Sequence, residues 1–196
     1  MSSSRPLLDR WLAAVLATPG LTGIRDAGAA RRALLEDSLR GVELVSREQG
    51  PLVDVGSGGG APGLPLAQSL PELEVVLLEA DGRKCRFLEQ WAPPNARVVH
   101  GRAEEQPLDW AGVAVAKALA HPPTAAEWCL PLVRPGGAVI LWVGPTADRA
   151  HVTRVASRLS AEAEDAPDGF ILLRKLAPTP GGFPRRAGMA KKRPLP

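Results

Sequence analysis

The chain has 196 residues, of which 45% are apolar and 23% are charged. This length allows one sizeable hydrophobic core and is short for two full domains, and the apolar fraction excludes a disordered protein. Its 24 basic and 21 acidic residues give a formal net charge of +3. It contains no run of about 18 apolar residues, which excludes an evident transmembrane helix.

Helical periodicity characterises the first part of the chain. Apolar residues recur at helical spacing over 5–17 and predict an amphipathic helix, which the Thr-Pro-Gly sequence at 18–20 ends. A second helix is predicted over about 28–47, before the Gly-Pro pair at 50–51 breaks the chain. The sequence therefore begins with two helices.

From residue 51 onward, short apolar runs alternate with helical stretches. Continuous apolar runs are typical of strands buried on both faces, and strands alternating with helices favour a doubly wound, mostly parallel α/β sheet. The predicted strands are 52–55, 75–79, 97–100, 113–116, 138–143 and 170–173. The predicted helices lie near 62–70, at 82–91, near 123–133 and at about 147–160.

The C-terminal end is basic. Residues 169–196 contain seven Lys and Arg and no acid, which leaves 17 basic against 21 acidic residues, a net charge of −4, in 1–168. A mildly acidic body with a basic end indicates a polyanionic partner at that end. Residues 177–196 also contain five prolines, so no regular element is predicted there.

The densest motif is the glycine-rich sequence from Asp54 to Gly63, between the first predicted strand and the next helix. Glycine allows positive φ and a close approach of backbone to a ligand, and a helix start presents free N–H groups. A nucleoside triphosphate is disfavoured because Leu64, not Lys, follows Gly63. The spacing Gly58-x-Gly60-x-x-Gly63 does match a dinucleotide fingerprint. A dinucleotide-dependent oxidoreductase therefore stays open.

S-adenosyl-L-methionine is the third candidate ligand. Its frame is Asp54, Gly56, Gly58 and Gly60, with a carboxylate at the strand end that suits a cationic amino group and a sulfonium and would repel a pyrophosphate. Glu79 ends the second predicted strand and can accept two hydrogen bonds from ribose hydroxyls. These features favour a methyl donor over a dinucleotide.

Several stretches resemble one family. Residues 54–67 are similar to the nucleotide-binding loop of the GidB/RsmG family, ribosomal RNA small subunit methyltransferase G, whose members methylate N7 of one guanine in 16S rRNA. Further similar stretches are 21–26, 37–39, 78–88, 101–104, 127–137 and the basic signature at 183–195. The resemblance runs from about residue 7 to the end. It implies a class I, Rossmann-like methyltransferase with short N-terminal helices, which converts S-adenosyl-L-methionine to S-adenosyl-L-homocysteine.

The resemblance also implies positions for the cofactor. Gly56 and Ala61 would line the methionine and ribose side, Glu79, Ala80 and Asp81 would meet the ribose and adenine, and Ala103 and Glu104 would flank the adenine. Lys117 stands where the family usually has an arginine, and a role in positioning is expected for it. No catalytic acid, base or metal is expected, because guanine N7 carries a free lone pair and the three histidines are scattered.

The expected RNA contacts are the phosphate-binding cations of the tail, Arg185, Arg186, Lys191, Lys192 and Arg193. The expected partner is 16S rRNA or the small ribosomal subunit, with no membrane. Departures from the family pattern, such as Leu34 in place of a histidine, keep two alternatives open. These are another RNA methyltransferase of the same fold and a non-catalytic RNA-binding descendant.

The chain divides into an N-terminal helical extension packed on the core (1–48), a methyltransferase domain (49–176) and a basic Pro/Gly-rich tail (177–196). The two cysteines have no disulfide or metal spacing, and Asp9 and Arg10 interrupt any signal-peptide core. We expect a cytoplasmic monomer.

Overall fold

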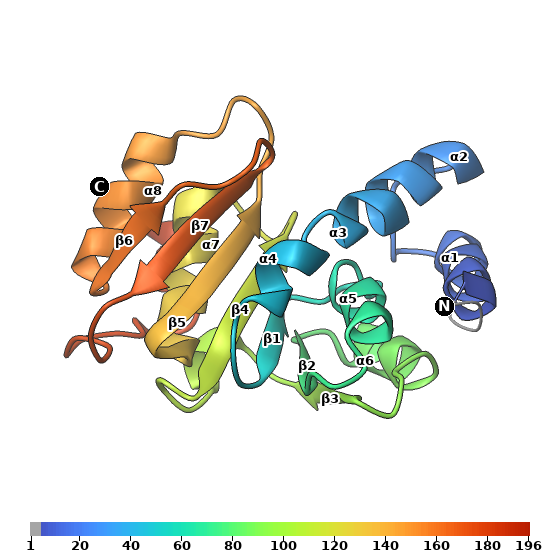
Figure 1. Cartoon of the computed structure of the whole chain (residues 1–196), viewed down its shortest axis with the longest axis horizontal. Coiled ribbons are helices and arrows are strands. Elements are labelled where there is room, and N and C mark those ends of the chain that lie inside the picture. The colour runs from blue at the N-terminus through green and yellow to red at the C-terminus, as the bar shows by residue number, and fades with distance from the viewer. Residues whose placement is uncertain (1–4) are drawn as a thin grey trace.

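The computed structural model describes residues 5–196. Residues 1–4 lie outside the described residues; they begin the predicted N-terminal extension and the segment that was considered as a signal peptide. The described strands form one seven-stranded sheet in the order β3-β2-β1-β4-β5-β7-β6 (Figure 1). Their bounds are β1 Leu52–Val55, β2 Val75–Glu79, β3 Ala96–His100, β4 Ala111–Lys117, β5 Val133–Trp142, β6 Ala161–Glu164 and β7 Phe170–Lys175.

Helices cover both faces of this sheet. The α-helices are α1 Arg5–Ala17, α2 Ala27–Ala30, α3 Asp37–Leu39, α4 Val42–Ser46, α5 Gly63–Ser69, α6 Gly82–Glu89, α7 Pro122–Cys129, α8 Arg149–Arg158 and α9 Met189–Lys192. The π-helix η1 spans Arg31–Glu36, and the 3-10 helices η2 and η3 span Ala103–Glu105 and Leu130–Leu132. None of these helices has the length and apolar character that a membrane crossing requires.

The strands pair as a mostly parallel sheet. β1 pairs in parallel with β2 and β4, and β3 and β5 extend it in parallel on either side. β7 is antiparallel to β5, and β6 is antiparallel to β7. The predicted α/β fold class is therefore confirmed. The prediction missed β6, because this edge strand reads Ala-Glu-Ala-Glu, buries only Ala161 and has no apolar run.

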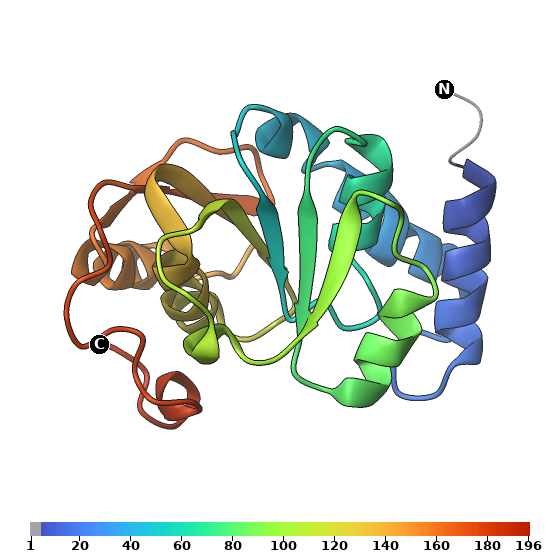
Figure 2. The ribbon, with the colours of Figure 1, turned by 90° about the horizontal axis from the view of Figure 1, so that it is seen from below.

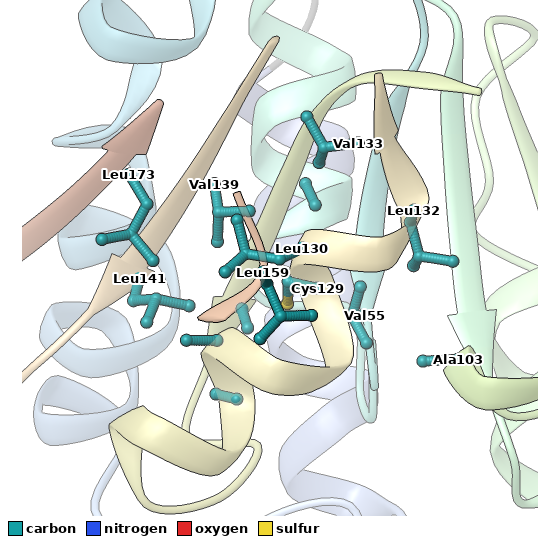
Figure 3. Packing of buried hydrophobic residues seen from close by; sticks show 14 of the residues in the cluster. Val55, Ala103, Cys129, Leu130, Leu132, Val133, Val139, Leu141, Leu159 and Leu173 are labelled. Carbon is teal, nitrogen blue, oxygen red and sulfur yellow. The ribbon is translucent and has the colours of Figure 1, made fainter. Parts of the chain in front are cut away.

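Alternate residues of each strand point to opposite faces and form two cores. Val53 and Val55 of β1 point to the face that α7 and α8 cover. Figure 3 shows buried side chains of this core. Leu52 packs on the other face, against α1, the N-terminal helices, α5 and α6. Asp54 shares that second face, and its carboxylate meets the start of α5. The two cores explain why the strands read as continuous apolar runs.

The predicted single helix over 28–47 is wrong, because α2, η1, α3 and α4 replace it. The indole Nε1 of Trp142 donates a hydrogen bond to the carbonyl oxygen of Asp37 at 2.9 Å. In an unbroken helix that oxygen would accept from the N–H of Gly41. Gly41 instead donates to Ser38, and a Cβ at Gly41 would overlap the ring of Trp142. A residue on β5 therefore ends the helix.

The prediction that 177–196 contains no regular element is also wrong. The tail folds back beside α7 and includes α9 (Figure 2). Ala190 and Leu195 are buried, and the guanidinium of Arg185 binds both carboxylate oxygens of Glu127 at 2.5 and 2.6 Å. Glu127 is only 3% exposed, so this ion pair fixes the tail to the body of the protein.

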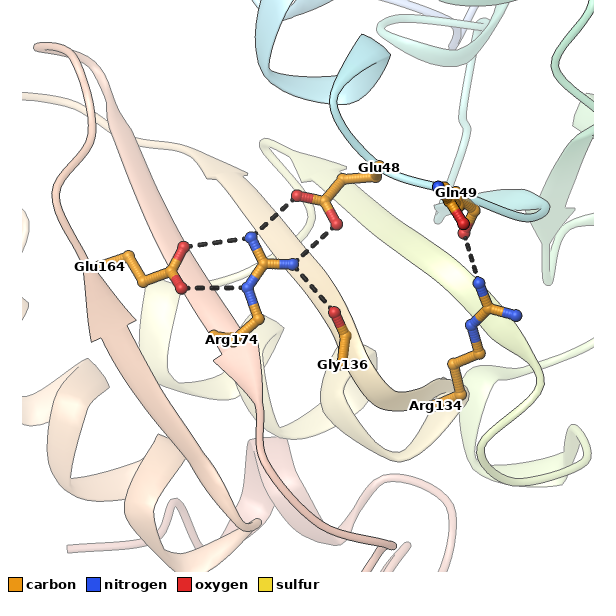
Figure 4. Close-up of polar contacts among 6 residues, drawn as sticks. All are labelled: Glu48, Gln49, Arg134, Gly136, Glu164 and Arg174. Atoms are coloured by element: carbon orange, nitrogen blue, oxygen red, sulfur yellow. Dashed lines mark hydrogen bonds and ion pairs between the residues drawn. The ribbon is translucent and has the colours of Figure 1, made fainter.

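A second ion cluster fastens the end of the N-terminal segment to the sheet (Figure 4). Arg174 on β7 donates to both carboxylate oxygens of Glu48, at 2.8 and 2.9 Å, and to Glu164 on β6. It also donates to the carbonyl oxygen of Gly136. The hydrogen bonds to Glu48 and then to Glu164 raise the pKa of Arg174 further above its usual value.

Glu48→Gln is expected to lower the free energy of unfolding by about 2 kcal/mol, the usual worth of hydrogen bonds to a charged group, because the amide cannot accept at both positions. Urea denaturation measures this change. Glu43→Gln is the control, since Glu43 pairs with Arg47 at the exposed surface and its loss should change stability by no more than about 0.5 kcal/mol. Equal effects of the two substitutions would contradict the role of this cluster.

Candidate active site

A cavity of about 520 Å³ opens at the carboxyl ends of β1, β2 and β4. The chain reverses its order there, since β2 and β3 lie on one side of β1 and β4 lies on the other. Open α/β sheets bind ligands at such a switch point. The glycine-rich loop forms the floor of this cavity, and the walls come from the N-terminal segment, the β3–β4 connection and the end of β4.

The backbone of the glycine-rich loop needs glycine at two positions that face the cavity. Gly56 and Gly58 have φ values of +71° and +57°, in the left-handed region that side chains disfavour. A Cβ on Gly56 would also overlap Cδ1 of Leu119, which follows β4. The glycine at position 56 therefore allows Leu119 to lie directly against the loop.

Glu79 holds this loop through its carboxylate. Oε2 accepts a hydrogen bond from the N–H of Gly58 and Oε1 accepts one from the N–H of Asp81, both at 2.8 Å. Each oxygen keeps a further lone pair, so the fixed carboxylate can still accept from two vicinal hydroxyls. The sequence prediction that Glu79 binds ribose is compatible with this geometry.

Asp54 does not line the cavity, although the sequence analysis placed it against the ligand. Its side chain is only 1% exposed, and Oδ2 accepts from the N–H of Gly63, the first residue of α5, at 3.0 Å. Oδ1 is buried and has no hydrogen-bond partner among the described residues. Burial raises the pKa of Asp54 to about 7. Its role is to join β1 to α5 behind the loop.

The N-terminal segment forms one wall of the cavity. The indole of Trp11 on α1 donates to the carbonyl oxygen of Gly59 at 2.8 Å, and Trp11 is only 1% exposed. Val15, Leu21 and Leu34 line the cavity beside it. The amphipathic pattern of α1 identified Trp11 as apolar but carried no signal that it would bind the glycine-rich loop.

Lys117 ends β4 and lines the cavity. Its ammonium lies 3.1 Å from Oδ2 of Asp37, and its side chain is 15% exposed. Asp37 also accepts from Arg40. The sequence analysis did not assign Asp37 a role, although 37–39 belong to one of the family-like stretches. This ion pair joins the N-terminal segment to the end of β4.

The tail contacts one residue of the cavity wall. The N–H of Gly188 donates to Oε1 of Glu104 at 3.0 Å, and Glu104 lines the cavity. The four tail cations other than Arg185 are exposed, namely Arg186, Lys191, Lys192 and Arg193. The sequence analysis expected the guanidinium of Arg185 to be free for an RNA phosphate. It is instead paired with the carboxylate of Glu127.

The structure brings most of the expected cofactor residues together. Those that line the cavity are Gly56, Gly58, Ala61, Glu79, Ala80, Ala103, Glu104 and Lys117. Asp54 and Gly60 belong to the loop but do not line the cavity, and a Cβ at Gly60 would overlap the side chain of Leu64. Asp81 is the N-cap of α6 and accepts from the N–H of Arg83. These three residues support the cavity wall from outside it.

The fold, the glycine-rich loop and the carboxylate at the end of β2 define a Rossmann-like site for a ligand that contains a nucleoside. Two solved methyltransferases are similar in fold alone. The Thermus thermophilus 16S rRNA N2 G1207 methyltransferase, solved with AdoMet and guanosine, is 16% identical with a TM-score of 0.52, over 67% of this chain and 36% of that one. The antibiotic-resistance methyltransferase Kmr is 17% identical with a TM-score of 0.54, over 72% of this chain and 91% of that one.

Sequence comparison defines the family. The family model for rRNA small subunit methyltransferase G matches residues 8–166. The ribosomal RNA small subunit methyltransferase G of Chloroflexus aggregans is 35% identical, over 89% of this chain and 82% of that protein. The protein of the same name from Synechococcus elongatus is 33% identical over the same shares. The chain belongs to the rRNA small subunit methyltransferase G family, as the sequence motifs predicted.

The cavity fits S-adenosyl-L-methionine, the methyl donor of this family. Its volume suits a nucleoside with an amino-acid side chain, and glycine at position 56 keeps the floor free of a Cβ. Glu79 offers fixed acceptors for the two hydroxyls of a ribose. The dinucleotide alternative has no support in the family match.

Asp54→Asn tests the buried carboxylate through pH. The folded protein retains the proton of Asp54 up to about pH 7, whereas the unfolded chain releases it near pH 4, so the wild-type free energy of unfolding falls as pH rises between these values. The variant lacks this loss. We expect the two proteins to be similar near pH 4, and the variant to gain up to about 4 kcal/mol relative to wild type by pH 7, with no further change above.

Denaturant unfolding of the cofactor-free protein from pH 4 to pH 8.5 measures both slopes. Parallel curves for the two proteins over this range would contradict a raised pKa at Asp54.

Proposed function

We propose that this protein methylates N7 of a guanine in 16S rRNA, the activity of its family, with S-adenosyl-L-methionine as donor. The observation that carries the proposal is the cavity at the β1–β4 switch point, where the glycine-rich loop and the fixed carboxylate of Glu79 meet. The tail, which contacts Glu104 at the wall of this cavity, carries four exposed cations that suit an RNA backbone.

The residues proposed to hold the donor are those on the cavity wall. Glu79 accepts from the ribose hydroxyls, Ala103 and Glu104 flank the adenine, and the loop at Gly56 and Gly58 contacts the methionine side by its backbone. Asp54 and Asp81 act from behind the wall, by fixing α5 and α6. We therefore propose that they support the cavity and do not contact the ligand.

When bound, S-adenosyl-L-methionine would supply an electrophilic methyl group to the lone pair of N7. The electron pair of the broken carbon–sulfur bond would remain on sulfur. N7 is an unprotonated acceptor, so the chain needs no general base. Its residues accelerate transfer by holding N7 and the methyl group in line and by excluding water. Lys117, fixed by Asp37, is proposed to bind the target's phosphate or guanine O6.

The tail is proposed to bind the RNA backbone through Arg186, Lys191, Lys192 and Arg193. Arg185 is proposed to hold the tail in place instead, because Glu127 occupies its guanidinium. The division into an extension (1–48), a methyltransferase domain (49–176) and a tail stays a prediction. We also propose that the protein acts in the cytoplasm as a monomer.

Glu79→Gln is expected to raise the dissociation constant for S-adenosyl-L-methionine at least tenfold. Both carboxylate oxygens of Glu79 accept backbone N–H groups. In glutamine the NH2 group replaces one of these oxygens and must face the N–H of Gly58 or of Asp81, so that two donors oppose each other. Isothermal titration calorimetry measures the affinity. Glu105→Gln is the control, because Glu105 is exposed and does not line the cavity. An unchanged affinity in Glu79→Gln would contradict the ribose contact.

The function itself is tested by labelled-methyl transfer to 16S rRNA, both as naked RNA and within the small subunit, followed by mapping of the modified base. We expect one N7-methylguanine. The double variant Arg186→Ala/Arg193→Ala should raise the KM for RNA and reduce the slope of its salt dependence by about one unit per lost phosphate contact, with donor affinity unchanged.

Arg47→Ala/Arg134→Ala is the matched control, since it removes the same charge near the amino ends of the strands. No transfer to either form of the RNA, or modification at another atom, would contradict the proposed function.

A further inference from the structure

A second cavity, of about 540 Å³, adjoins the first and is called here the tail-side cavity. It lies between the β4–α7 connection, the β5–α8 connection and the tail. The lining residues on which the argument depends are Leu119, Pro122, Trp128, Gly144, Asp148 and Lys191. Leu119 and Trp128 line both cavities, so one wall separates them.

The lining suits a flat ligand that carries hydrogen-bond donors and a phosphate. Leu119, Pro122 and the indole of Trp128 offer apolar surface to a planar ring. Among the described residues that line this cavity, Asp148 is the one acid and Lys191 is the one lysine or arginine. A heteroaromatic ring with ring N–H donors and a phosphate needs an apolar surface for the ring, an acid for the donors and a cation for the phosphate. A nucleotide is therefore the class of ligand that the cavity fits.

We propose that the tail-side cavity binds the target guanine nucleotide, an inference that rests on the proposed function. The cavity adjoins the cofactor site across Leu119 and Trp128, which is the relation that direct methyl transfer requires. Lys191 and Pro194 of the basic tail also line it. An RNA held by the tail can therefore extend one nucleotide into it.

Asp148 sets the orientation of the base. Its Oδ1 caps α8 by accepting from the N–H of His151 at 2.9 Å, which holds the carboxylate at the cavity wall. A carboxylate recognises guanine through N1–H and the 2-amino group, both donors on one edge of the base. N7 lies on the opposite side of the ring from these donors, which leaves it free to face the wall shared with the cofactor site. Adenine lacks both donors and is disfavoured.

The tail completes the cavity through α9. Lys191 is exposed on this helix and binds the phosphate of the extended nucleotide. The imidazole Nε2 of His151 lies 2.6 Å from the carbonyl oxygen of Leu195, and Arg185 binds Glu127. These two contacts hold the segment that carries Lys191 against α8 and α7. The tail is thus a wall of the substrate site as well as an RNA-binding surface.

Gly144→Leu tests the cavity by filling it. A Cβ at Gly144 meets no heavy atom within 4 Å and its φ is not in the left-handed region, so the backbone accepts the change. Gly181→Leu is the matched control, because Gly181 is equally open and does not line the cavity. We expect Gly144→Leu to lower kcat/KM for RNA at least tenfold with donor affinity unchanged, and Gly181→Leu to stay within twofold of wild type.

Guanosine monophosphate probes the cavity without catalysis. In ¹⁵N spectra, the indole N–H signal of Trp128, assigned with Trp128→Phe, should shift on addition of this nucleotide to wild type and to Gly181→Leu but not to Gly144→Leu. Inosine monophosphate lacks the 2-amino group and should bind wild type more weakly. Asp148→Asn keeps the cap of α8, since asparagine caps as well as aspartate, and should remove the preference for guanosine over inosine monophosphate.

The outcomes separate this inference from the proposed function. A Trp128 signal that does not respond to guanosine monophosphate, or responds equally in Gly144→Leu, overturns the base site even if the protein methylates 16S rRNA. Equal kcat/KM values for the two leucine variants also overturn it. Binding of the nucleotide in the cavity without any methyl transfer to rRNA would support the site and contradict the function.

Discussion

The site depends on one interaction, the carboxylate of Glu79 held between the N–H groups of Gly58 and Asp81. It joins the end of β2 to the loop that follows β1, so two adjacent parallel strands share one rigid edge. Asp54 fixes the far end of the loop to α5 from behind. Two acids hold one loop, one at the cavity and one in the core, and their different surroundings give them different roles.

The segments outside the central sheet complete this edge. Trp11 binds the loop from α1, Asp37 holds Lys117 from α3, and the tail meets Glu104 through Gly188. The N-terminal segment therefore lines the site, and the tail contacts one of the lining residues. The cluster of Arg174 and Glu48 fastens the end of the N-terminal segment in the same way (Figure 4).

The sequence predicted what depends on local pattern. The bounds of β1 and β2 agree with the structure, because their apolar runs are buried on both faces and end at a glycine or a carboxylate. The end of the helix at Leu39 depends on Trp142, which lies 105 residues beyond its hydrogen-bond partner Asp37. The place of Asp54 follows from strand alternation, which puts it on the face of Leu52. The pairing of Arg185 with Glu127 likewise joins residues whose contact no local pattern encodes.

A crystal structure with S-adenosyl-L-homocysteine tests the central claim most directly. The account predicts that both ribose hydroxyls lie within hydrogen-bond distance of the carboxylate of Glu79, with the adenine beside Ala103. A nucleoside bound elsewhere, or a ribose that does not contact Glu79, would contradict it.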